Sequence, residues 1–108
     1  ISPEDLNFYF IAENNKSAVD HLTKFYSRYH SSRYVAENLV IRMKTPLQDK
    51  QIKQLNDKFS LLIKEGKIEQ RGAFEIEKEF EELPRLVFHH TKNNFGTLRA
   101  LIDCINDF

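Results

Sequence analysis

The residue types best suited to binding a ligand are concentrated in residues 25–34, whose sequence is FYSRYHSSRY. This segment combines four aromatic rings, two arginines, one histidine and three serines. An arginine binds a phosphate or carboxylate through two parallel hydrogen bonds, serine hydroxyls add donors, and tyrosine rings pack against planar groups. The candidate ligand-binding residues are Arg28, His30, Ser31, Ser32, Arg33 and Tyr34.

The same segment is also compatible with two further roles. Its tyrosines can line the contact between a helix and a sheet while its arginines pair with nearby acids, which is a purely structural role. Alternatively, the segment can form a contact between subunits. The residue types alone leave these three roles open.

Other patterns typical of catalysis or of cofactor binding are missing from the sequence. The glycines Gly66, Gly72 and Gly96 are scattered, so there is no glycine-rich phosphate loop. His89 and His90 are adjacent in an expected strand, which turns their side chains to opposite faces. We therefore expect no metal site, no cofactor and no catalytic residue in this chain.

Cys104 lies among the apolar positions of an expected helix and is interpreted as an inert, partly buried thiol. Residues 75–82 carry five glutamates within eight positions. Such a run predicts a mobile surface connection with no fixed geometry for acid–base catalysis.

The composition is that of one soluble globular domain. The chain has 108 residues, of which 41% are hydrophobic and 30% charged, and its formal net charge is zero. Zero net charge argues against a broad nucleic-acid surface, and no apolar run is long enough for a membrane span. A single cysteine excludes an internal disulfide and favours the cytoplasm. Because the chain begins with Ile1 rather than methionine, we expect a processed protein or a piece of a longer one.

Apolar periodicity predicts seven elements. The expected order is strand, helix, strand, helix, strand, strand, helix, at about residues 6–11, 16–30, 39–44, 46–65, 68–72, 85–90 and 94–105. The near-continuous apolar start of the strand at 85–90 predicts burial on both faces.

The second helix has the clearest predicted boundaries. Thr45 is the expected N-cap, Pro46 the first helical residue and Gln48 the capping-box partner, with Gly66 as the C-terminal stop. The final helix is expected to begin at a cap formed by Asn93 or Asn94.

The predicted fold class is α+β: a small, incomplete split βαβ (ferredoxin-like) sheet with helices on one face, preceded by a strand and a helix. The last strand of that motif is missing, which would leave a sheet edge exposed. The first strand, another subunit or a neighbouring domain could pair with this edge.

Four stretches resemble the C-terminal portion of long-form LOG-family proteins, the Rossmann-like proteins also called lysine-decarboxylase-like. They are YHSSRYV at 29–35, LVIR at 39–42, LPRLVFH at 83–89 and NFGTLRALIDCIN at 94–106. The resemblance implies that residues 1–14 are the tail of an N-terminal nucleotide-binding domain and that residues 15–108 are a C-terminal α+β accessory domain.

LOG-type enzymes hydrolyse nucleoside 5′-monophosphates and carry a Pro-Gly-Gly-x-Gly-Thr-x-x-Glu motif for phosphate and ribose. This chain has no Gly-Gly pair, so the resemblance transfers no catalytic residue to it. It implies a non-catalytic accessory domain whose parent is a phosphoribohydrolase, with the parent's own N-terminal domain or a second copy as partner. Such a domain would cover the nucleotide site or form subunit contacts.

Two other hypotheses remain open. The chain is a stand-alone module that binds a nucleoside monophosphate or another anion through residues 25–34, or it serves only oligomerisation.

Overall fold

The computed structural model describes residues 25–108. The predicted strand at 6–11, most of the predicted helix at 16–30 and the predicted domain boundary after residue 14 lie outside the described residues. The described elements are β1 (Tyr29–Val35), β2 (Asn38–Met43), α3 (Asp49–Lys58), the short 3-10 helix η2 (Ser60–Leu62), β3 (Ile63–Arg71), β4 (Arg85–His90) and α4 (Phe95–Asp107).

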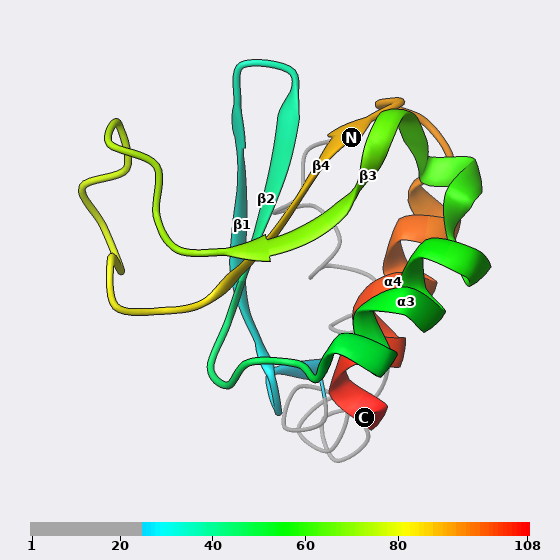
Figure 1. The fold of residues 1–108 in the computed structure, drawn as a ribbon, viewed down its shortest axis with the longest axis horizontal. Helices are drawn as coiled ribbons and strands as arrows, with labels where there is room; N and C mark the ends of the chain where they lie inside the picture. The colour runs from blue at the N-terminus through cyan, green and yellow to red at the C-terminus, as the bar shows by residue number, and fades with distance from the viewer. Residues whose placement is uncertain (1–24) are drawn as a thin grey trace, which may run out of the picture.

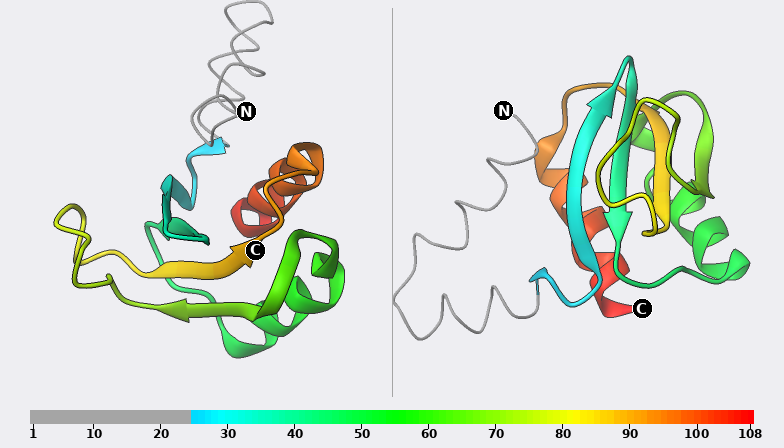
Figure 2. Two further views of the ribbon diagram at one scale, coloured as in Figure 1. Left: turned by 90° about the horizontal axis from the view of Figure 1, so that it is seen from above. Right: turned by 90° about the vertical axis from the view of Figure 1, so that its left-hand side faces the viewer.

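The strands form one antiparallel sheet in the order β1-β2-β4-β3. Both long helices cover the same face of this sheet, and the connection between β3 and β4 lies on the other side (Figures 1 and 2). The predicted α+β class with helices on one face is confirmed.

Strand β1 occupies the edge where the predicted motif lacked a strand. From β2 to α4 the chain follows the split βαβ order, with β4 inserted between β2 and β3. β1 pairs with the free side of β2, from Val35 opposite Asn38 to Tyr29 opposite Met43. The edge beside β2 is therefore filled from within this chain, by the segment that immediately precedes β2.

The prediction of a helix through residue 30 is wrong at its end. Residues 26–28 form a turn and bends, and Tyr29 begins β1. Asn106 of α4 stabilises this change of direction, because its side-chain oxygen accepts the backbone N–H groups of Arg28 at 2.8 Å and Tyr29 at 2.9 Å. The tyrosines up to Tyr29 have helical spacing, so the sequence did not indicate that a strand begins at Tyr29. The start of this strand depends on Asn106, which is nearly eighty positions away.

The hydrophobic core lies between the sheet and the helices. Alternate residues of the central strands point into it, including Ile41 of β2 and Phe88 of β4, and α4 contributes Leu101 and Ile105. Both faces of β4 are buried at its start, as predicted, since Arg85, Leu86, Val87 and Phe88 all belong to the buried class.

Helix α3 begins later than predicted. Its N-cap is Gln48, which forms a capping box with Gln51 rather than serving as the capping-box partner of Thr45. The delay has a tertiary cause: the side chain of Gln70 on β3 pairs with the backbone of Leu47, accepting its N–H at 2.7 Å and donating to its carbonyl at 3.1 Å. These bonds hold residues before Gln48 in an extended path.

The predicted C-terminal stop at Gly66 is also wrong. α3 ends at Lys58, and the chain passes through η2 into β3, so Gly66 lies inside a strand. The pairing of β3 with β4 shifts register between Glu65 and Glu69, and Gly66 takes a positive φ of 74° there. A glycine is suited to such a bulge because it has no Cβ to clash in the left-handed region.

Asn56 of α3 protects the outer edge of β3. Its side chain accepts the Ile68 N–H at 2.7 Å and donates to the Ile68 carbonyl at 3.0 Å. The carboxamide thus takes the place that a neighbouring strand would occupy on this edge.

We expect Asn56→Ala to lower the free energy of unfolding by about 1–3 kcal/mol, because it leaves two part-buried backbone groups of Ile68 without partners. Urea denaturation of the variant and of the exposed neighbour Asp57→Ala, as control, measures this difference. Equal stability of the two variants would contradict a role for Asn56 in covering the edge.

Candidate functional site

Three arginines stand side by side across the sheet face that turns away from the helices. Arg42 of β2 is opposite Arg85 of β4, and Arg85 is opposite Arg71 of β3. Ser31 of β1 extends this row beyond Arg42. Like charges directly opposite each other destabilise a sheet, so this arginine row needs negative charge from elsewhere.

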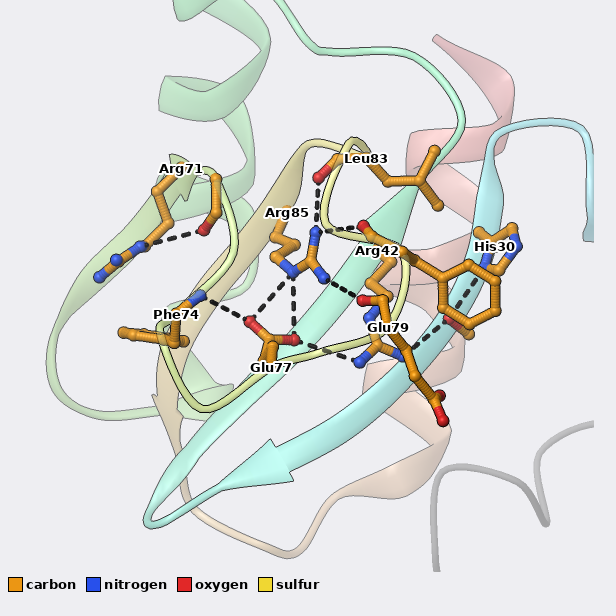
Figure 3. A network of polar contacts seen from close by, with 11 residues as sticks. His30, Arg42, Arg71, Phe74, Glu77, Glu79, Leu83 and Arg85 are labelled. Carbon is orange, nitrogen blue, oxygen red and sulfur yellow. Dashed lines mark hydrogen bonds and ion pairs between the residues drawn. The ribbon is translucent and has the colours of Figure 1, made fainter.

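Glu77 supplies that charge from the β3–β4 connection. Residues 72–84, which we name the strap, cross over the arginine row and place the Glu77 carboxylate between Arg85 and Arg42 (Figure 3). The Arg85 Nε donates to both carboxylate oxygens at 3.1 and 3.0 Å, and the Arg42 Nη2 donates to Oε1 at 3.2 Å. Arg85 and Glu77 are completely buried and Arg42 nearly so.

Arg85 also holds the backbone of the strap. Its two terminal nitrogens donate to the carbonyl oxygens of Phe80 at 2.9 Å, Leu83 at 2.6 Å and Glu79 at 3.0 Å. One guanidinium therefore binds a carboxylate and three carbonyls of the same connection, which is more than any lysine could do in a fixed geometry.

Arg42 is less fully paired than Arg85. Its Nη1 donates to the Ser31 hydroxyl at 3.3 Å, and its guanidinium lies 5.4 Å from the centre of the Phe80 ring. Its buried Nε has no hydrogen-bond partner within residues 25–108. Two buried arginines thus share one carboxylate, which leaves the cluster with an excess of positive charge.

The pKa of Glu77 lies below its ordinary value. Burial alone would raise this pKa, but the Phe74 N–H and the hydrogen bonds and charges of Arg85 and Arg42 favour the ionised form and outweigh it. The prediction that residues 75–82 have no fixed geometry is therefore wrong for Glu77. The charge run hid a buried ion pair whose partners lie on other segments.

The strap also exposes apolar side chains. Ile76 is 66% exposed and Phe80 is 41% exposed. Phe80 has a positive φ of 53°, a strained conformation for a bulky residue. The Arg85 bond to its carbonyl and the edge-on contact with the His30 ring, at 4.4 Å between centroids, keep it there.

The six residues singled out from the sequence do not form one cluster. A bulge at the start of β1 places His30 and Ser31 on the strap side, where Arg33 also lies opposite Val40. Ser32 and Tyr34 share the helix side, where the Tyr34 hydroxyl bonds His90. Arg28 is at the end of the sheet and donates to the Ile105 carbonyl at 3.0 Å and to the Thr45 hydroxyl at 3.0 Å.

His30, Ser31 and Arg33 therefore remain together as candidates on the strap side. The Arg33 guanidinium has no hydrogen-bond or ion-pair partner within residues 25–108. The pKa of His30 is lowered by its burial and by the charges of Arg42 and Lys44, against a smaller opposing effect of Glu82.

The sequence patterns did not single out Arg42, Glu77 or Arg85. The local signal of the two arginines is weak: each is a charged residue beside an apolar run that is otherwise typical of a buried strand. Glu77 is one of five glutamates in its run, and nothing local distinguishes it from the four exposed ones.

A second polar pair lies on the helix side, where His90 is buried and Tyr34 is half-buried. The Tyr34 hydroxyl and the His90 Nδ1 are 2.7 Å apart, and the two rings are stacked. The Phe88 and Phe95 rings enclose the imidazole, whose Nε2 makes no hydrogen bond within residues 25–108. Burial is the main cause that lowers the pKa of His90, so the imidazole is neutral at pH 7.

The chemistry that the strap-side site supports is the binding of an oxyanion. Two buried guanidinium groups, a serine hydroxyl and the nearby Arg33 are donors without reactive character of their own.

No protein-family model, curated protein or solved structure matches this chain. Within residues 25–108 there is no helix of the length and apolarity that crossing a membrane requires.

We expect Glu77→Gln to lower the free energy of unfolding by about 3–5 kcal/mol, because it leaves two buried arginines without a counter-charge. At a pH below the ordinary glutamate pKa, Glu77 is protonated in the unfolded wild type but still ionised in the folded protein. The stability of the wild type therefore falls as the pH drops from about 5 to about 3. The variant should lose this component of the pH dependence in urea denaturation. The exposed Glu79→Gln is the control and should stay within about 0.5 kcal/mol of wild type.

We expect a second loss of stability between about pH 7 and pH 5, to which the lowered pKa values of His90 and His30 both contribute. The unfolded imidazole takes up a proton near its ordinary pKa while the buried one does not, so stability rises with pH in this window. His90→Gln should make the profile flatter than that of wild type in urea denaturation. An unchanged slope in His90→Gln would contradict this assignment.

Proposed function

We propose that residues 25–108 are a non-catalytic accessory domain of a LOG-like nucleotide-binding protein, which forms subunit contacts or covers the nucleotide site. The observation that carries the proposal is the strap, which displays Ile76 and Phe80 to solvent on a backbone held by a buried ion pair.

A surface of this kind suits contact with another protein surface. Apolar side chains on an ordered backbone lose little conformational freedom on binding, so more of the buried area contributes to affinity. Arg85 and Glu77 have already ordered the strap before any partner arrives. Folding has therefore already met the entropic cost of ordering this surface.

The charge on the strap indicates the chemistry of the partner surface. The side chains of Glu75, Glu79, Glu81 and Glu82 are exposed around the two apolar residues, with Lys78 as the only basic residue between Gly72 and Pro84. The complementary surface is an apolar depression bordered by lysines or arginines.

The resemblance to the LOG family supplies the rest of the proposal. It makes the partner surface part of the parent's nucleotide-binding domain or of a second copy, and the parent a hydrolase of nucleoside 5′-monophosphates. The named residues of this chain then act by contact and not by catalysis.

A photo-crosslinking residue introduced at Ile76, in the protein as its source cell makes it, tests the contact surface. We expect a crosslink to an upstream domain of the same polypeptide or to a second copy, identified by mass spectrometry. The same residue at Leu61, which is 62% exposed in η2, is the control. Crosslinking from Ile76 no greater than from Leu61 would argue against the strap as a contact surface.

The non-catalytic part of the proposal is tested separately. The purified 108-residue chain, incubated with AMP, should release neither adenine nor ribose 5-phosphate above the rate of a blank. Turnover of AMP by this chain would overturn the accessory role.

A second function, a stand-alone module for a small phosphorylated or carboxylated ligand, is favoured by the unpaired Arg33 beside His30 and Ser31. We expect AMP or inorganic phosphate to raise Tm, and Arg33→Ala to abolish the increase. Arg99→Ala, which removes an arginine of α4, is the control. No change in Tm with either ligand counts against this module.

A further inference from the structure

We propose that Arg42 and Arg85 form an oxyanion site in which the Glu77 carboxylate is a built-in, exchangeable occupant. An external phosphate or carboxylate displaces Glu77, and the strap then leaves the sheet face. This inference goes beyond the functions proposed above, because it places the oxyanion on Arg42 and Arg85 and not on Arg33.

The sheet face by itself is a site without an anion. Its three arginines stand opposite one another on β2, β4 and β3. The exposed Glu69 of β3 shares the face with Arg71, yet it forms no ion pair with the row within residues 25–108. Among the described residues, the carboxylate that pairs with the row comes from the strap.

Glu77 occupies the row as a bound ligand would. The Arg85 Nε–H is shared between both carboxylate oxygens, and the Arg42 Nη2 donates to one of them, so all of these hydrogen bonds are charge-assisted. The Ser31 hydroxyl and the unpartnered Arg42 Nε border the same cluster. A phosphate has more acceptor oxygens than the carboxylate, so it can use a donor that Glu77 leaves unpaired.

The attachment of the strap is mostly polar, although its Phe80 ring contacts His30 and Arg42 and its Phe74 ring contacts Arg71. None of the buried side chains of the hydrophobic core comes from residues 72–84, and Glu77 is the one buried side chain in that range. The strap is instead tied by Arg85 to three carbonyls and by the Pro84 carbonyl, which accepts the Met43 N–H at 2.9 Å. Displacing one carboxylate therefore removes the main charge that holds the strap, while the core remains intact.

The Glu77→Ala chain tests whether the site accepts an external anion. With inorganic phosphate as probe and sodium chloride at matched ionic strength as reference, we expect Tm to rise by roughly 5–10 °C at about ten times the dissociation constant. Acetate should give a smaller rise. The double variant Glu77→Ala/Arg42→Gln should lose the difference between phosphate and chloride. Absence of any phosphate-specific rise in Glu77→Ala overturns the proposal.

Wild-type protein provides the second measurement, which remains decisive even where Glu77→Ala does not fold. Hydrogen–deuterium exchange of the peptide covering the strap should become faster with phosphate, saturably, while α4 stays protected and chloride has no effect. If phosphate does not change deuterium uptake in the strap, the proposal that phosphate displaces Glu77 is overturned. A failure of this proposal can be told apart from a failure of the accessory function, because the crosslinking experiment at Ile76 is done with Glu77 in place. It can also be told apart from a failure of the stand-alone module, because the module depends on Arg33.

Discussion

The carboxylate of Glu77, shared by Arg85 and Arg42, is the interaction on which the strap side of this protein depends. Without it the sheet would place three arginines opposite one another, two of them buried. With it, the Arg85 guanidinium also holds three carbonyls of the connection, including that of Phe80, whose φ is positive. The ion pair of Glu77 with Arg85 is thus the buried charged contact between residues 72–84 and the sheet, and backbone hydrogen bonds to Arg85 and Met43 accompany it.

The two faces of the sheet consequently have different physical characters. The helix side is an apolar core that contains the buried His90, bonded to the half-buried Tyr34. The imidazole stays neutral because burial disfavours its charge. The strap side is held largely by ions and hydrogen bonds, and Val40 and Val87 are its buried apolar side chains on β2 and β4. Core packing resists local opening, whereas polar attachment is sensitive to competing ions, so we expect conformational change on the strap side.

The proposed functions use this difference. In the first proposal the apolar side chains of the strap form a contact surface, and in the further inference the arginines beneath it form an oxyanion site. If an anion releases the strap, it also moves Ile76 and Phe80, so the two activities would be coupled through Glu77. Such coupling suits an accessory domain next to a nucleotide site, because a phosphate-bearing ligand could then alter the contact between domains.

Local patterns in the sequence were sufficient to predict β2, β4 and α4. Each of these elements buries one set of its side chains in the core, and that set appears in the sequence as alternating or helically spaced apolar residues. The α+β class followed from these elements.

Tertiary contacts decided the rest: Asn106 ends the turn before β1, Gln70 delays α3, and paired strands bring Arg42 and Arg85 to the same carboxylate. Among the predicted site residues, strand alternation turned Arg33 and Tyr34 to opposite faces, although they are neighbours in the sequence. The sequence by itself determined the apolar pattern of each element. The structure decided the partners of its polar groups, because those partners lie on distant segments and a single sequence carries no local signal of them.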